Sequence, residues 1–109
     1  MFVAREVASQ VVRSLPEVIA AVGRHDRSLA DQLRRAGSSL LLNIAEGNRR
    51  VGRDRLHFFR IAAGSAAEVD AVLEVAVGFG YVGDDEVTKA RRLLDRQLAL
   101  LWGLTHRRR

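Results

Sequence analysis

The chain has no cysteine, a single proline and no apolar run that approaches the roughly 18 residues of a membrane span. Without cysteine, neither a disulfide framework nor a thiolate metal site can form. The amino-terminal segment carries charge every few residues, so it predicts neither a signal peptide nor a membrane helix. A chain of 109 residues is expected to form one domain, residues 1–109. We therefore expect a soluble protein of the cytoplasm.

Basic residues outnumber acidic residues by 18 to 13, and all but one of the basic residues are arginine. The planar guanidinium group suits phosphate and carboxylate partners. The charge lies in blocks: residues 24–60 and 91–109 each carry an excess of five positive charges, and residues 61–90 carry an excess of five negative charges. The basic blocks permit contact with a polyanion, and an ordinary solvated surface explains them equally well.

Apolar residues recur at steps of three or four along the chain, which predicts helices with one buried face. The first such stripe, residues 3–22, contains the proline at position 16, so it predicts either one kinked helix or two helices. The sequence SLPE suggests a capping box with Ser14 as the cap and Glu17 reaching back. A second box, SLAD at residues 28–31, is expected to open a helix that ends at Gly47 in a left-handed conformation.

A third helix is predicted for about residues 52–79, and its apolar residues spread nearly all round it. So much apolar surface should be covered on two sides, by the bundle and by another subunit. Asp84 is expected to cap a fourth helix. The sequence contains neither an alternating strand pattern nor an internal repeat. It therefore predicts an all-α fold, an antiparallel up-down four-helix bundle with short loops.

Polar residues interrupt the apolar stripe at the end of the second predicted helix. Asn43 lies one turn before Glu46 and one turn after Ser39, so the three share one face. Because an unpaired buried amide costs about 1 to 3 kcal/mol, a partner should lie near, and the third helix offers two polar residues at a matching spacing. We expect a structural network that fixes the register of these helices or a subunit contact, with direct ligand contact as the alternative. Its members are Ser39, Asn43, Glu46, Gly47, Ser65 and Glu68.

Seven arginines in the first basic block are the candidates for phosphate contact. Phe58 and Phe59 are the aromatic residues close to them, and the helical pattern assigns both rings to the core. Base-specific recognition is therefore not expected, and any binding should be led by the nucleic-acid backbone and weaken with salt. The candidate arginines are Arg34, Arg35, Arg49, Arg50, Arg53, Arg55 and Arg60.

Catalytic patterns are absent from the sequence. The three histidines, at positions 25, 57 and 106, have no metal-ligand spacing, and neither a nucleophile elbow nor a phosphate loop is present. Glu68, Asp70 and Glu74 suggest a carboxylate cluster, but Asp70 and Glu74 share a face suited to pairing with arginines of the fourth helix or of a neighbouring subunit. We expect a protein without catalytic residues, metal or cofactor.

Several short motifs occur in a specific order and spacing. They are QLRRA at 32–36, NIAEG at 43–47, Phe58, Ile61-Ala62, Gly64-Ser65, Glu68 and Gly80-Tyr81. In these motifs the chain resembles the small four-helix-bundle proteins encoded within intervening sequences of bacterial large-subunit ribosomal RNA genes. A related branch is the accessory variability determinant of diversity-generating retroelements. The resemblance implies a homopentameric ring or barrel with basic surfaces, which in the retroelement branch contacts nucleic acid and a reverse transcriptase.

Two functions agree with these observations. One is a non-enzymatic, oligomeric accessory factor that contacts RNA or DNA backbones, with a reverse transcriptase or another protein as a further candidate partner. The other is an oligomeric scaffold that binds a protein and has no nucleic-acid role. The tail HRRR, residues 106–109, is expected to add to polyanion contact, and Trp102 is expected in either the core or an interface.

Overall fold

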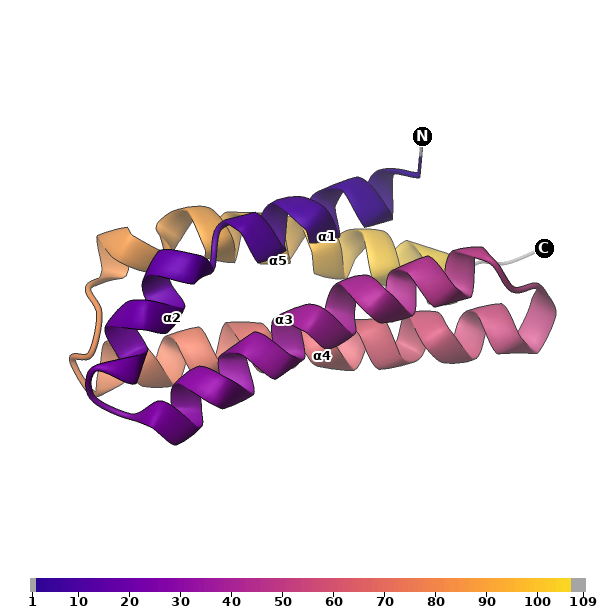
Figure 1. The fold of residues 1–109 in the computed structure, drawn as a ribbon. Helices are drawn as coiled ribbons and strands as arrows, with labels where there is room; N and C mark the ends of the chain where they lie inside the picture. The colour runs from indigo at the N-terminus through magenta and orange to yellow at the C-terminus, as the bar shows by residue number, and fades with distance from the viewer. Residues whose placement is uncertain (1, 107–109) are drawn as a thin grey trace.

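The computed structural model describes residues 2–106 and forms an elongated bundle of helices, 46 × 21 × 21 Å (Figure 1). The helices are α1 (Val3–Arg13), α2 (Pro16–Gly23), α3 (Arg27–Asn48), α4 (Gly52–Gly78) and α5 (Asp84–Thr105). The described residues include no β-strand, which confirms the predicted all-helical bundle. α2 continues from α1 after a bend, and α3, α4 and α5 then run in alternating directions along the bundle. The α3–α4 turn lies at the same end of the bundle as both ends of the described chain, and the α4–α5 turn lies at the opposite end.

The first predicted helix is split in two at the proline. Pro16 occupies the first turn of α2, where its missing N–H removes no helical hydrogen bond. The predicted capping box is wrong, because Leu15 holds the N-cap position and makes no side-chain hydrogen bond there. The Ser14 hydroxyl instead donates to the Val11 carbonyl at 2.6 Å and so closes α1. The break lets α1 pack on α3 and α5 while α2 turns towards α3.

Three other helix ends also differ from their predicted caps. Asp26 caps α3 by accepting from the Leu29 N–H at 2.9 Å, two residues before the box expected at residues 28–31. Gly83, and not Asp84, is the N-cap of α5, and its N–H donates to Glu86 at 2.8 Å. Gly47 is an ordinary helical residue inside α3, because positive φ angles among the described residues occur at Gly52 and Gly80 alone.

The core runs along the bundle axis and receives side chains from every helix. Aliphatic residues of α1 and α3 meet Phe59 and Leu73 of α4 and Leu94 of α5. Burial of this apolar surface stabilises the bundle, and the close packing leaves little room for added atoms. Gln97 of α5 is fully buried among these residues, and neither polar atom of its side chain has a hydrogen-bond partner.

α4 carries more apolar surface than the core covers, as the sequence predicts. Its inner face is buried, whereas Ile61 and Val75 are partly exposed and Phe79, just past its end, is 69% exposed. None of the described helices is long and apolar enough to cross a membrane.

Candidate nucleic-acid interface

A short hydrogen-bond chain joins the middle of α3 to the middle of α4. The Ser65 hydroxyl donates to the Ser39 hydroxyl oxygen at 2.8 Å. The Asn43 amide donates to the same oxygen at 3.0 Å and to the Ser39 carbonyl at 2.8 Å. Ser65 is buried, and Ser39 and Asn43 are half-buried. These hydrogen bonds therefore take the place of water at the buried Ser65 hydroxyl and fix the register of the two helices. The structure thus brings together three of the six residues predicted for this network.

The two predicted glutamates lie outside that chain. Glu46 accepts from Arg50 at 2.8 Å and lies 3.9 Å from Arg49, so it pairs with the arginines that follow it. Glu68 is exposed and accepts from the Gln32 amide at 3.2 Å, which adds a second polar contact between α3 and α4. Glu46 is half-buried and Glu68 is exposed, and both accept hydrogen bonds from residues outside the hydroxyl chain.

Gly47 has a packing role. A methyl group at this position would lie 2.7 Å from two ring carbons of Phe59 and 3.2 Å from the Phe58 Cβ. Glycine is therefore required for the close approach of α3 and α4 next to their connecting turn, and backbone conformation does not require it.

Arg55, one of the arginines predicted to contact phosphate, makes several contacts within the protein. Its guanidinium group lies over the Phe59 ring at 4.8 Å and near the Phe2 ring at 5.8 Å. It donates to the carbonyls of Gly47 and Asn48 at 3.4 and 3.5 Å. Arg55 therefore caps the carboxyl end of α3, where unpaired carbonyls favour a positive charge.

Three of the seven arginines pair with carboxylates, and Arg49 does so most loosely, at 3.9 Å from Glu46. Arg34 forms an ion pair with Asp31 one turn earlier. Arg50 bridges Glu46 and Asp54 and lies over the Phe58 ring at 5.1 Å. Such exposed pairs add little stability, but they cancel the local charge that would attract a phosphate.

Arg49 and the remaining three arginines are exposed, and three of these four gather at one end of the bundle. Arg49, whose side chain is 78% exposed, closes α3, and Arg53 opens α4 on the other side of the turn. Arg60 lies two turns after Arg53 on the same side of α4. We call Arg49, Arg53 and Arg60 the turn arginines. Arg35 lies on α3 about 21 Å along the helix axis from Arg49, so the structure separates it from this group.

One carboxylate of α4, that of Asp70, forms an ion pair with α5. Asp70 accepts from Arg91 of α5 at 3.0 and 3.4 Å, as the sequence predicts for this face. The hydrogen bond to Asp70 is the main cause that raises the pKa of Arg91 above its ordinary value. Burial opposes this shift, and the negative charges of Asp70, Glu74 and Asp95 add to it. The described residues contain no group of three histidine, aspartate or glutamate side chains that could hold a metal ion.

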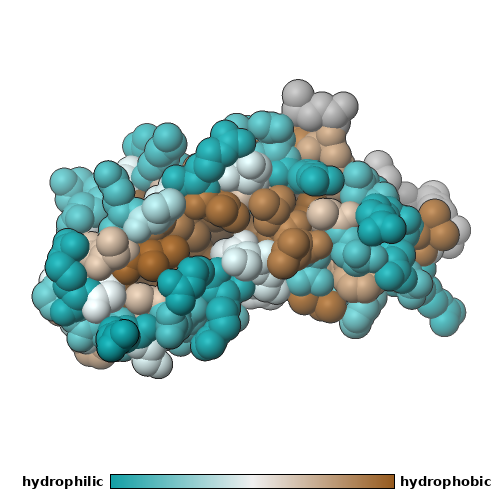
Figure 2. Space-filling view, viewed as in Figure 1, coloured by the Kyte–Doolittle hydropathy of each residue, from teal (hydrophilic) through white to brown (hydrophobic). Residues whose placement is uncertain are grey.

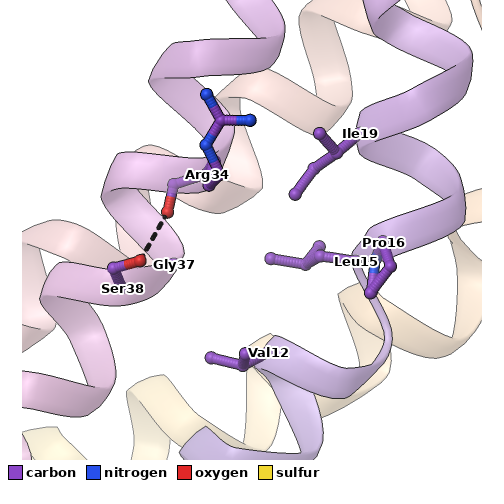
Figure 3. Close-up of a pocket in the computed structure, with 7 residues that line it drawn as sticks. All are labelled: Val12, Leu15, Pro16, Ile19, Arg34, Gly37 and Ser38. Carbon is purple, nitrogen blue, oxygen red and sulfur yellow. Dashed lines mark hydrogen bonds between the residues drawn. The ribbon is translucent and has the colours of Figure 1, made fainter.

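An apolar cleft opens beside the break between α1 and α2, with a volume of about 370 Å³. In Figure 3 the side chains of Val12, Leu15 and Ile19 point across it towards α3, where Gly37 leaves room for Leu15. Arg34 lies at its rim. Figure 2 shows a band of hydrophobic residues along the middle of this face of the molecule. The cleft is lined by Val12, Leu15, Pro16, Ile19, Arg34, Gly37 and Ser38.

Trp102 was not predicted as a site residue, and it is 63% exposed on the last turns of α5. Its indole is stacked on the His106 imidazole, with ring centres 4.3 Å apart and planes at 10°. A signal for this position is present in the sequence, because the apolar stripe of the fourth helix runs through Leu98 and Leu101 and omits residue 102. The predicted contribution of the tail arginines 107–109 lies outside the described residues.

The fold and sequence agree with a known family. Residues 3–103 match the model of the 23S rRNA-intervening sequence proteins. A crystal structure of a protein of unknown function from the S23 ribosomal protein family of Bacteroides thetaiotaomicron is similar, with a TM-score of 0.85 and 17% sequence identity. The match covers 94% of this chain and 98% of that chain, and at this identity it shows the fold alone. No curated protein matches the chain. The chain belongs to the 23S rRNA-intervening sequence protein family.

Proposed function

We propose that this protein is a non-enzymatic, cytoplasmic accessory factor that contacts the phosphate backbone of RNA or DNA through the turn arginines. The observation that carries the proposal is the gathering of Arg49, Arg53 and Arg60 at one end of the bundle. Arg53 and Arg60 are exposed without a carboxylate partner among the described residues, and Arg49 is 3.9 Å from its nearest one. The guanidinium groups of Arg53 and Arg60 can therefore pair with phosphate without first breaking an ion pair inside the protein, and Arg49 would give up only its 3.9 Å contact with Glu46.

Self-association is the second part of the proposal. The outer side of α4 carries exposed apolar and small residues at helical spacing, with Ile61, Gly64 and Val75 on it. A second copy of the chain would cover this surface. The resemblance to the retroelement branch favours five copies, so that five net charges of +5 would act together on one polyanion. The same resemblance makes a reverse transcriptase a candidate partner.

Salt dependence tests the nucleic-acid contact. The affinity for an RNA or DNA duplex is measured between about 50 and 200 mM salt, and a steep fall is expected because phosphate contacts release counterions. Arg53→Ala should weaken binding and lower the salt slope by about one. Arg34→Ala removes the same charge from an arginine that is already paired with Asp31, so it is the matched control. A flat salt dependence, or equal effects of the two variants, contradicts the proposal.

A protein-binding scaffold is the second candidate, and the apolar cleft beside Pro16 favours it. A cleft of about 370 Å³ lined mainly by aliphatic side chains suits an apolar side chain of a partner. Ile19→Asp places a charge in the cleft and should abolish such an interaction while nucleic-acid binding stays unchanged. Co-purification of the same protein partner with the parent chain and with this variant contradicts use of the cleft.

A further inference from the structure

The stacked pair of Trp102 and His106 forms an exposed aromatic platform near the carboxyl end of α5. The imidazole is held by two polar contacts of its Nδ1, at 2.9 Å to the Trp102 carbonyl and 3.0 Å to the Thr105 hydroxyl. The imidazole is therefore held against the indole by contacts within the protein, and both residues are exposed. An exposed, oriented indole ring is the group that proteins use to stack an unpaired base.

The register of α4 and α5 brings a turn arginine level with this platform. The Asp70 to Arg91 ion pair joins the two antiparallel helices. Counting ten residues from Asp70 and ten from Arg91 towards the end of the bundle that holds the α3–α4 turn leads to Arg60 of α4 and to residue 101 of α5. Arg60 is therefore level, along the bundle axis, with the residue next to Trp102. Arg53 precedes Arg60 by two turns and lies on the same side of α4, about 10 Å nearer the α3–α4 turn. Arg60 is thus level with the platform along the bundle axis, and Arg53 lies beyond it towards the end of the bundle.

The distribution of charge sets this platform apart from the other exposed aromatic group. Phe79 and Tyr81, with ring centres 5.6 Å apart, lie at the opposite end of the bundle. The acidic first turn of α5, Asp84 to Glu86, follows them directly and would repel phosphate. On the side of Trp102, the one acidic residue of the last three turns of α5 is Asp95, two turns from the indole, about 10 Å along the axis. A nucleic-acid strand is therefore favoured at Trp102 and disfavoured at Phe79.

We propose that Trp102 and His106 are a stacking site for an unpaired base, so that the protein prefers single-stranded RNA or DNA. Arg60 and Arg53 would hold the flanking phosphates of the same strand. A base in a duplex is already stacked on its neighbours, so a duplex gains from the arginines alone. This inference rests on the proposed nucleic-acid function and adds to it the form of the nucleic acid and the residues that select it.

Trp102 is the only tryptophan of the chain, so its own fluorescence reports the contact. An unlabelled single-stranded oligonucleotide and a duplex of the same sequence are titrated into the full chain at fixed salt, and affinities are measured separately with labelled strands. The single strand should quench the emission more than the duplex. Trp102→Ala should lower single-strand affinity on the order of tenfold and leave duplex affinity unchanged. Trp102→Phe retains a ring and should restore most of that loss.

Phe79→Ala is the control, because it removes an equally exposed ring from the acidic end and should change neither affinity. Single-strand affinity that survives Trp102→Ala overturns the stacking site, even if the proposed function stands. The stacking site is also overturned if the fluorescence of Trp102 in the free protein is that of a buried tryptophan and is not quenched by acrylamide. In that case another copy of the chain or a protein partner covers the ring. Failure to bind either nucleic acid overturns the proposed function itself.

Discussion

Gly47→Ala tests whether the close contact at the α3–α4 turn is as tight as its geometry indicates. The new methyl group would meet two ring carbons of Phe59 at 2.7 Å, and this ring is 1% exposed, so it has no open space into which to move. Overpacking of this kind costs about 1 to 3 kcal/mol. Replacing glycine by alanine in a helix returns at most about 1 kcal/mol. We expect a net loss of about 1 to 2 kcal/mol, which for a domain of this size lowers the Tm by roughly 4 to 16 °C.

Gly64→Ala is the matched control for this measurement. Gly64 also lies inside a helix, and a methyl group there would meet no atom within 4 Å in the single chain. This variant should gain roughly 0.5 to 1 kcal/mol from helix propensity alone. Both variants are unfolded thermally at one protein concentration, with their size measured by sedimentation. If Gly47→Ala is stabilised as much as Gly64→Ala, the Phe59 ring is not fixed and the argument fails. Dissociation of an oligomer by Gly64→Ala would instead place α4 in a subunit contact.

Three further experiments test the roles assigned to individual residues. Arg55→Ala should lower the Tm without weakening nucleic-acid binding, since the Arg55 guanidinium caps α3. Arg53→Ala should weaken nucleic-acid binding without lowering the Tm. Thermal unfolding and a binding titration of both variants test this. Ser65→Ala should cost about 1 kcal/mol in denaturant unfolding and Asn43→Ala less, because Ser65 is buried and Asn43 is half-exposed; equal and negligible effects would contradict a structural network. Gln97→Met should raise the free energy of unfolding by about 1 kcal/mol, since it removes two buried polar atoms that lack partners; a loss of stability would reveal a partner in the assembled protein.

The helices could be predicted because each has a long apolar stripe, and many residues contribute to that signal. Their ends could not, because each end depends on one or two hydrogen bonds. Asp26 and Ser28 are both good caps, and the sequence alone does not decide which of them meets the Leu29 N–H. Gly47 was assigned to the end of α3 for its conformational freedom, whereas the structure shows that the neighbouring Phe59 ring requires it.

The roles of individual arginines were also beyond the sequence. Arg53 and Arg55 are two residues apart and chemically identical, yet one is exposed to solvent and the other lies over Phe59 and closes α3. This difference arises from the position of each residue on α4 relative to the end of α3, which the helical period gives only when the neighbouring helix is known. The link from Ser39 to Ser65 was predictable, since both lie on the facing sides of two adjacent helices.

The turn arginines, Trp102 and both ends of the described chain share one end of a rod that is twice as long as it is wide. A ligand held there leaves most of the long sides of the rod uncovered. Contacts between copies along these sides would then add binding ends without hiding any of them, and a strand that reaches several ends would gain affinity through effective concentration.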